Sequence, residues 1–251
     1  MTLLMLLGCA ELASRPLPGA AADLPPQEAS APDETLLTDT ADTAEAAPCP
    51  DEMAALDGFC MDRFEAPGES GSLPLVMYTL TEAADWCAAR GKRLCYDDEW
   101  QSACEGAAGT AYPYGDTHQP GVCNDDETWR TYSQSSLSLW PSSVSAADID
   151  SLDALLAAAS AISKTASQHV AWLYQAEPAG SNEGCTNETG VYDLIGNVEE
   201  WTLRRDGGAD SFTGNLKGRY WSESRTCGSN ITTHADSFRF YEIGFRCCLD
   251  L

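Results

Sequence analysis

Residues Gly190–Trp201 read GVYDLIGNVEEW, and this stretch decides the fold. Its centre is a Gly196-Asn197 step, which is typical of a tight turn. Asp193 and Glu200 stand on either side of the step. Acids on either side of a tight turn can be ordinary turn and surface residues or can have a specific role, and the stretch alone leaves both open.

Five other segments accompany this stretch in a fixed order. They are Phe59–Glu65 (FCMDRFE), Glu82–Cys104 (EAADWCAARGKRLCYDDEWQSAC), Tyr112–Asp116 (YPYGD), Cys123-Asn124 and Gly244–Cys247 (GFRC). Beyond Gly106 the chain is rich in Gly, Pro, Asn, Asp and aromatic residues, with few periodic runs. This composition predicts many loops and few regular elements, held by disulfides or bound ions.

The composition excludes several classes of protein. The chain has 251 residues, with 14 Lys and Arg against 39 Asp and Glu, for a net charge of −25. Such a charge argues against sequence-independent binding of nucleic acid, because nothing offsets the repulsion from phosphates. A hydrophobic share of 43% and 7 Trp are too high for a disordered chain. No apolar run approaches the roughly 20 residues that span a bilayer.

The cysteine content points to disulfides. The 11 Cys form no CxxC pair and are accompanied by only 3 His, so zinc clusters explain them poorly. Disulfides formed in an oxidising compartment explain the count better. The odd number requires one cysteine with a separate fate.

The N-terminus offers that separate fate. Leu6-Leu7-Gly8-Cys9 has the form of a bacterial lipobox, so we expect a lipoprotein signal peptide over residues 1–9 and lipidation of Cys9. This predicts a cell-envelope protein, periplasmic or on the outer surface, held to the membrane by a lipid anchor. No Lys or Arg precedes the short apolar stretch, however. An ordinary apolar N-terminus or a misassigned start codon is therefore the alternative.

Residues 10–48 are expected to form a disordered acidic tether. They consist largely of Ala, Pro, Asp, Glu and Thr, with few large apolar side chains. Such a segment cannot bury enough surface to offset the entropy lost on ordering. The folded domain is therefore expected over residues 49–251.

Three helical stretches are expected within that domain. Thr79-Leu80-Thr81-Glu82 is a capping box that begins a helix stopped by Gly91. A second helix is expected from Asp97 or Asp98 to Gly106. Between residues 145 and 174, apolar residues recur every three or four positions, which predicts an amphipathic helix that breaks near Lys164.

The six segments, taken in order, resemble the formylglycine-generating enzyme family, also called the sulfatase-modifying-factor family. The corresponding family patterns are an "FCIDRYE" strand, an "EA..YC...GKRLPTEAEWE.A" helix pair, "YPWGD", a "CN" step, "GLYDMxGNVWEW" and a terminal "GFRC". The resemblance implies an α+β fold, a loop-rich variant of the C-type lectin fold stabilised by disulfides and Ca²⁺. Residues at about 128–179 exceed what the family places there, so the helix in this region is expected to be an insertion.

The resemblance also implies metal ligands and disulfides. One Ca²⁺ site would use the Asp193 and Glu200 carboxylates with the Gly196 and Val198 carbonyls. A second would use Asn124 and the Asp125 carbonyl, but its other ligands fall where this chain carries its insertion. The implied bridges are Cys87–Cys247 and Cys104–Cys227. The pairs Cys49–Cys60, Cys123–Cys185 and Cys95–Cys248 remain as one possible arrangement, because connectivity does not follow from sequence.

The copper chemistry of the family is not expected here. The authentic enzyme oxidises a substrate cysteine at a Cu(I) ion held by two nearby cysteines that follow a "GGS" segment, and soft thiolates suit Cu(I). The matching stretch, residues 216–227, holds one cysteine, Cys227, which the resemblance makes a structural half-cystine. Arg219 stands where "GGS" should continue. Iron-dependent relatives use a three-histidine set with an HxH-like pair, which His118, His169 and His234 do not provide.

Two classes of function therefore remain open. The first is a tethered, non-copper binding or structural module, with a protein, peptide or glycan as ligand. The second is an enzyme of the family, either a formylglycine-generating oxidoreductase or a periplasmic relative that modifies a peptide or a siderophore. Candidate binding residues are Tyr220, Trp221, Arg225, His234, Arg239 and Tyr241, although aromatic residues in this region can also belong to the core, and a lone histidine in a loop is often merely exposed.

Overall fold

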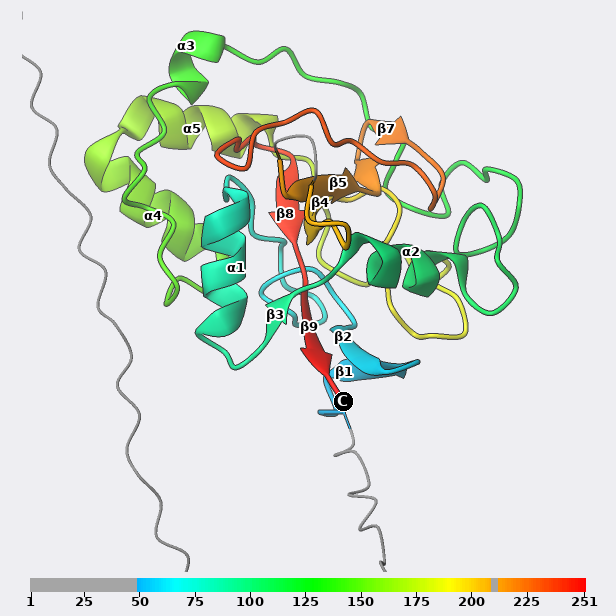
Figure 1. The fold of residues 1–251 in the computed structure, drawn as a ribbon. Coiled ribbons are helices and arrows are strands. Elements are labelled where there is room, and N and C mark those ends of the chain that lie inside the picture. Colours follow the sequence, from blue (N-terminus) through cyan, green and yellow to red (C-terminus); the bar gives the residue numbers. More distant parts are fainter. Residues whose placement is uncertain (1–48, 209–211) are drawn as a thin grey trace, which may run out of the picture. The chain divides into compact units, whose positions relative to one another are not determined.

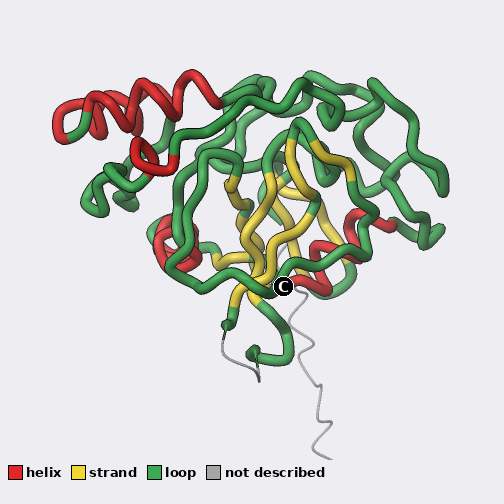
Figure 2. Tube along the Cα trace, turned by 90° about the horizontal axis from the view of Figure 1, so that it is seen from above, coloured by secondary structure: helices red, strands yellow, loops and turns green. Residues whose placement is uncertain are grey.

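The computed structural model describes residues 49–208 and 212–251. Short strands lie at the centre, helices lie at the margins, and loops make up most of the chain (Figure 2). The predicted loop-rich α+β architecture is confirmed. The predicted signal peptide, Cys9 and the tether lie outside the described residues. No helix in the described part is long and apolar enough to cross a membrane.

Three small sheets make up the strand framework (Figure 1). The first has the order β1-β2-β9-β3, all antiparallel. The second has the order β5-β4-β8, in which β4 pairs with β8 in parallel, and β6 and β7 form a third. The strands are β1 Met53–Leu56, β2 Phe59–Asp62, β3 Arg93–Leu94, β4 Glu199–Leu203, β5 Gly214–Lys217, β6 Arg219–Tyr220, β7 Glu223–Ser224, β8 Ile243–Phe245 and β9 Cys247–Asp250.

The GFRC segment joins the two larger sheets, because β8 belongs to one sheet, β9 to the other, and Arg246 lies between them. Each residue of the segment meets a separate requirement. A Cβ on Gly244 would lie 2.8 Å from the Leu75 carbonyl oxygen, so only glycine fits. Phe245 packs in the core, Arg246 is fully buried, and Cys247 forms a disulfide.

The two predicted short helices are confirmed. Helix α1 spans Leu80–Ala88 and begins at Thr79 with the expected capping box. Helix α2 spans Asp97–Glu105, and Gly106 follows it in a left-handed conformation (φ 59°). In both helices one face is buried, with Trp86 and Cys87 on α1 and Trp100 and Cys104 on α2, which fixes them against the strands.

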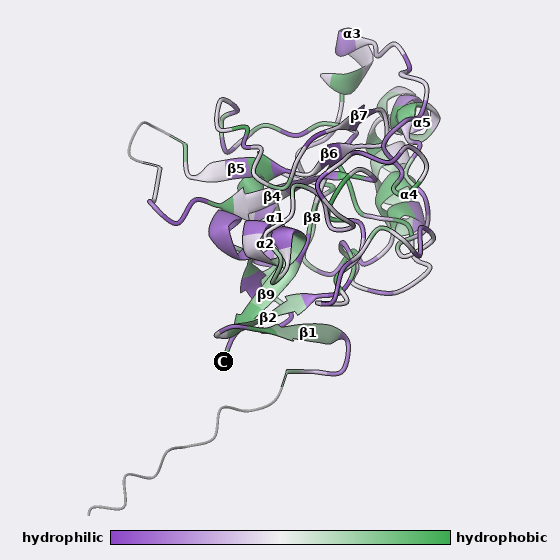
Figure 3. Ribbon diagram, turned by 90° about the vertical axis from the view of Figure 1, so that its right-hand side faces the viewer, coloured by the Kyte–Doolittle hydropathy of each residue, from purple (hydrophilic) through white to green (hydrophobic). Residues whose placement is uncertain are grey.

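The stretch between residues 145 and 174 forms two helices. Helix α4 spans Leu152–Ile162 and α5 spans Lys164–Leu173, so the predicted break falls at Ser163, which caps α5 with its side chain. Residues 145–151 are not helical, and a short helix α3 (Gln134–Leu137) was not expected. Figure 3 shows that α4 is mostly hydrophobic, whereas α2 is mostly hydrophilic.

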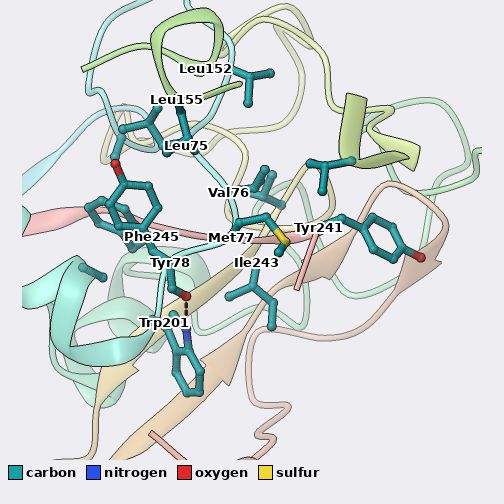
Figure 4. Close-up of a cluster of buried hydrophobic side chains, with 14 of the residues drawn as sticks. Leu75, Val76, Met77, Tyr78, Leu152, Leu155, Trp201, Tyr241, Ile243 and Phe245 are labelled. Carbon is teal, nitrogen blue, oxygen red and sulfur yellow. Dashed lines mark hydrogen bonds between the residues drawn. The ribbon is translucent and has the colours of Figure 1, made fainter. Parts of the chain in front are cut away.

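We call α3, α4 and α5 the helical layer. Its apolar residues share one hydrophobic cluster with the domain: Leu152, Leu155 and Ala159 of α4 pack with Leu75, Val76 and Tyr78 (Figure 4). The Trp86 indole also donates a hydrogen bond to the Ile149 carbonyl at 2.7 Å. The layer therefore completes the domain core.

Ten cysteines form five disulfides. These are Cys49–Cys60, Cys87–Cys247, Cys95–Cys248, Cys104–Cys227 and Cys123–Cys185. They are the same pairs named from the sequence. Cys87–Cys247 connects α1 to β9, and Cys95–Cys248 connects the residue after β3 to β9. Cys123–Cys185 joins the two ends of the segment that carries the helical layer.

Candidate functional site

A buried ion pair holds the GVYDLIGNVEEW segment against the C-terminal strand. Arg246 donates from Nη2 to Glu200 Oε1 at 2.6 Å and from Nε to Glu200 Oε2 at 2.8 Å, and both side chains are fully buried. The Trp100 indole donates to the same Oε2 at 2.9 Å. Arg246 also donates to the carbonyls of Asp62 and Tyr192. A bidentate, fully hydrogen-bonded pair is the form in which a buried ion pair can be tolerated.

Asn197 organises the turn that precedes this pair. It adopts a positive φ of 54°, next to Gly196 at 76°. A Cβ on Gly196 would lie 2.2 Å from the Asn124 carbonyl oxygen, so this approach requires glycine. The Asn197 side-chain amide donates to Glu65 Oε1 at 3.0 Å, and its side-chain oxygen accepts from the Asn124 amide at 3.1 Å. The turn therefore connects three of the segments found in the sequence.

Glu65, Asp193 and Glu200 form a buried carboxylate cluster. Burial, strengthened by the charge of Asp193, raises the pKa of Glu65 well above its usual range. Burial also raises the pKa of Asp193 to about 6, although the Gly180 amide and Arg246 oppose that shift. The positive charge of Arg246 acts in the opposite direction and lowers the pKa values of both Glu65 and Asp193. Three carboxyl groups therefore share one guanidinium in the interior.

The cluster fits a divalent cation in part. Glu65 Oε2 is buried and has no hydrogen-bond partner in the described structure, which is an unusual state for a carboxylate oxygen. In the described ranges no three His, Cys, Asp or Glu side chains are arranged to hold a metal, so a cation here would also need backbone carbonyls such as those of Gly196 and Val198. The carboxylate of Glu200, which the resemblance makes a ligand, has Arg246 and Trp100 as partners instead.

The residues of the doubtful second site lie beside this cluster. Asn124 and Asp125 are both buried. The Asn124 amide donates to the Gln175 carbonyl at 3.2 Å, and Asp125 Oδ2 lies 2.8 Å from His118 Nε2. Asp125 Oδ1 is buried and has no hydrogen-bond partner within residues 49–208 and 212–251. The structure thus places the side chains of both residues in protein contacts.

The segment over residues 216–227 is held by a disulfide and by ion pairs. Cys227 is bonded to Cys104 of α2. Arg219 stands in a left-handed conformation (φ 59°), where its side chain donates to Glu199 Oε1 at 3.0 Å and pairs with Glu223. Arg219 therefore connects β6 of this segment to β4 and β7.

The prediction that three aromatic residues are exposed and contact a ligand is wrong. Tyr220, Trp221 and Tyr241 are buried, and their rings contact one another in the core. The packing of the helical layer and of residues 238–241 explains this, because Tyr174 and Phe240 contact the same ring cluster. These three residues are core residues and do not form a binding surface.

The three polar candidates for ligand binding have separate surroundings. Arg239 pairs with Glu82 of α1 at 2.8 Å. The His234 ring stacks on Phe238 with centroids 4.1 Å apart, and burial together with Arg219 lowers its pKa. Arg225 has a half-exposed side chain and lines a cavity of about 290 Å³. Of the six candidates, Arg225 is the one that this cavity contains.

Sequence reasoning missed several residues of these sites. Glu65 and Arg246 were inside recognised segments, but nothing in their spacing showed that they meet. Lys217, Asn230 and Glu242 had no signal in the sequence. Only the fold brings Glu242 beside Glu199, where burial and the Glu199 charge raise the pKa of Glu242 to about 8.

Comparison with known proteins identifies relatives. Residues 34–251 match the model of the sulfatase-modifying factor enzyme 1-like domain. The chain is 27% identical over 187 residues to proteins named inactive C-alpha-formylglycine-generating enzyme 2 from Bos taurus and from Mus musculus. The match covers 71% of this chain and 51% and 50% of those proteins. The chain thus spans about half the length of the curated relatives it matches.

Two solved structures were also found by their similarity to this chain. CarF is 15% identical, with a TM-score of 0.49, over 77% of this chain and 86% of that chain. PvdO from Pseudomonas aeruginosa is 18% identical, with a TM-score of 0.47, over 77% of this chain and 80% of that chain.

Proposed function

Because this chain belongs to the sulfatase-modifying factor enzyme 1-like family, we propose that it is a binding module of that family which does not use copper. The observation that carries the proposal is the disulfide between Cys227 and Cys104, in a stretch where residues 216–227 contain no second cysteine. Two thiolates are the least that linear Cu(I) coordination needs. The relatives named inactive C-alpha-formylglycine-generating enzyme 2 also support the proposal that this chain does not use copper.

The proposal is tested by Cu(I) titration of the full chain against a Cu(I) chelator. We expect no copper to transfer to the protein, and no oxygen consumption with a cysteine-containing peptide. Mutating Cys104 to Ala supplies a useful comparison, because it frees the Cys227 thiol. Stoichiometric Cu(I) binding by the unreduced wild-type chain would contradict the proposal.

We also propose that Ca²⁺ stabilises the module. Asp193 and Glu65 would supply carboxylate oxygens and Gly196 and Val198 would supply carbonyls, as suits a hard cation. The support is that three carboxyl groups in this cluster share one cation, and that Glu65 Oε2 is buried with no hydrogen-bond partner among the described residues. We expect Ca²⁺ to raise the melting temperature and E65Q to reduce that rise, whereas E183Q, which removes an exposed carboxylate, should leave it unchanged.

The expected location of the module is a further part of the proposal. Lipidation at Cys9 would hold the domain at the cell envelope on the acidic tether of residues 10–48. The support is the lipobox-like sequence alone. Metabolic labelling with a fatty-acid analogue tests it, and loss of label in C9S is the expected result.

An enzymatic role is the second candidate. A specific observation favours it: burial raises the pKa of Glu199 to about 7, and Glu199 and Glu242 interact. Two interacting carboxyls with a pKa near neutrality suit proton transfer. Glu199 is also paired with Arg219, which a structural role explains equally. Turnover of a peptide substrate that E199Q and E242Q abolish without unfolding would favour the enzyme.

A further inference from the structure

The cavity beside Arg225 differs in charge from the rest of this acidic chain. It is lined by Leu216, Gly218, Arg219, Arg225, Ser229, Asn230 and Ile231. None of these lining residues is acidic, although the chain has 39 acids against 14 bases. Another cavity, of about 390 Å³, is lined by Asp57, Asp98, Glu99 and Asp250 together with Arg205. A cavity lined by two arginines and by no acidic residue favours an anionic occupant.

Hydrogen bonds fix both arginines while leaving donors unused. Arg225 donates from Nε at 3.0 Å and from Nη2 at 2.6 Å to the same Glu223 oxygen. Its Nη1 has no hydrogen bond among the described residues. Arg219 is held by Glu199 and Glu223, and its buried Nε has no hydrogen-bond partner in the part of the chain that the structure describes. The left-handed conformation of Arg219 is costly for a residue with a side chain, and such strain is concentrated at functional sites.

A buried lysine adds positive charge behind the cavity wall. Lys217 is 1% exposed, and its Nζ lies 3.1 Å from the side-chain oxygen of Asn230, a wall residue. Within the described ranges no carboxylate pairs with it. Burial lowers its pKa to about 8, against the opposing charges of Asp97 and Glu105. Lys217 thus stands as a third basic residue beside Arg219 and Arg225, which are themselves bonded to Glu199 and Glu223.

Two aliphatic residues, Leu216 and Ile231, also line the cavity. They are joined by two backbone hydrogen bonds, of 3.0 and 3.2 Å. The guanidinium fork binds a carboxylate in two parallel hydrogen bonds, and the aliphatic residues accept a short hydrocarbon.

We propose that this cavity binds a small organic carboxylate, whose acid group contacts Arg225 and whose hydrocarbon part lies against Leu216 and Ile231. The inference rests on the proposed function, because it gives the binding module a ligand class. It is independent of whether Cu(I) binds. Arg225 selects a ligand with a negative charge, and Leu216 and Ile231 select a ligand whose remaining part is a short hydrocarbon.

Hexanoate is a suitable probe. It is titrated into the isotope-labelled full chain, and the amide signals of Arg225, Ser229, Asn230 and Ile231 are followed by NMR. We expect saturable shifts with a dissociation constant on the order of 1 mM, as suits so small a ligand. Hexanamide, which has the same shape and no charge, should cause no such shifts.

Two variants make the test specific. R225Q should weaken hexanoate binding by about tenfold while the rest of the spectrum stays unchanged, because Arg225 is half-exposed and outside the core. R205Q is the matched control, since Arg205 is also half-exposed and paired with acids but lines the acidic cavity. It should bind like the wild type.

The proposal is overturned if hexanoate causes no saturable shifts, if hexanamide binds equally well, or if R225Q binds hexanoate as tightly as R205Q. Each of these results would leave the Cu(I) titration unaffected. Conversely, Cu(I) binding by the unreduced chain would overturn the proposed function without changing the NMR result. The two failures can therefore be distinguished.

Discussion

The helical layer and the sheet region that contains Arg246 are stabilised by different interactions. Helices α4 and α5 present Leu155, Ala159, Val170 and other apolar residues to the core, and no cysteine lies between residues 124 and 184. The sheet region has four disulfides and a fully buried ion pair. Periodic apolar sequence suffices to fix a helix, whereas short strands and loops need covalent and ionic cross-links.

The disulfide at the base of the helical layer offers the largest expected effect. C123A/C185A removes a bridge between residues 62 apart, and the loop-entropy model gives a loss of about 4 kcal/mol in the free energy of unfolding. Urea denaturation measures it. C49A/C60A, whose cysteines are 11 apart, is the matched control and should lose about 3 kcal/mol. A larger loss in the control would contradict this account of the layer's attachment.

The buried ion pair gives the next largest effect, in the sheet region. Glu200→Gln leaves Arg246 buried without its counter-charge, so we expect a loss of about 3–5 kcal/mol. Equilibrium denaturation of the oxidised protein checks this value. The control is Asp206→Asn, which removes an exposed partner of Arg204 and should cost less than about 1 kcal/mol. Equal losses of stability in the two variants would contradict the view that the Glu200–Arg246 pair stabilises the sheet region.

A cavity mutation probes the helical layer by itself. Leu155 is fully buried, so Leu155→Ala should cost about 3 kcal/mol by lost burial and an unfilled cavity. Hydrogen exchange should report the loosening first in α4 and α5. Ile162→Ala, at an exposed position on the same helix, should cost little. Equal protection of α4 and α5 in Leu155→Ala and the wild type would contradict apolar packing as the source of their stability.

The last prediction concerns the pH dependence of stability. Burial and the Glu199 charge raise the pKa of Glu242 to about 8, so the folded state holds this proton more tightly than the unfolded state. The contribution of Glu242 to stability therefore falls as the pH rises from about 4.5 to about 8. Glu242→Gln should flatten that decline, measured as the free energy of unfolding at several pH values. The exposed Glu183→Gln should not change it, and an unaltered slope in Glu242→Gln would contradict the assignment.

The sequence allowed much of the framework to be predicted. The capping box at Thr79, the stop at Gly106 and the apolar spacing of α4 and α5 are local signals, so those helices could be placed. The family segments led to the family itself and to the residues of the NVEEW turn.

The site was harder to predict because its contacts join distant residues. Glu65 meets Asn197 across 132 positions, and Arg246 meets Glu200 across 46, which no local pattern reveals. Tyr220, Trp221 and Tyr241 looked like contact residues, but aromatic side chains serve a core or a surface equally well. The cavity at Arg225 arises from Leu216 and Ile231 pairing across a loop, which only the fold shows.

The central claim is that the ten cysteines which the fold brings together are structural, so that none of these ten keeps a thiol for copper. Alkylation of the native full chain, followed by peptide mapping before and after reduction, tests it most directly. We predict no label on any of the ten cysteines from Cys49 to Cys248 before reduction, and label on all ten afterwards. Label on Cys227 of the native, unreduced chain would contradict the account.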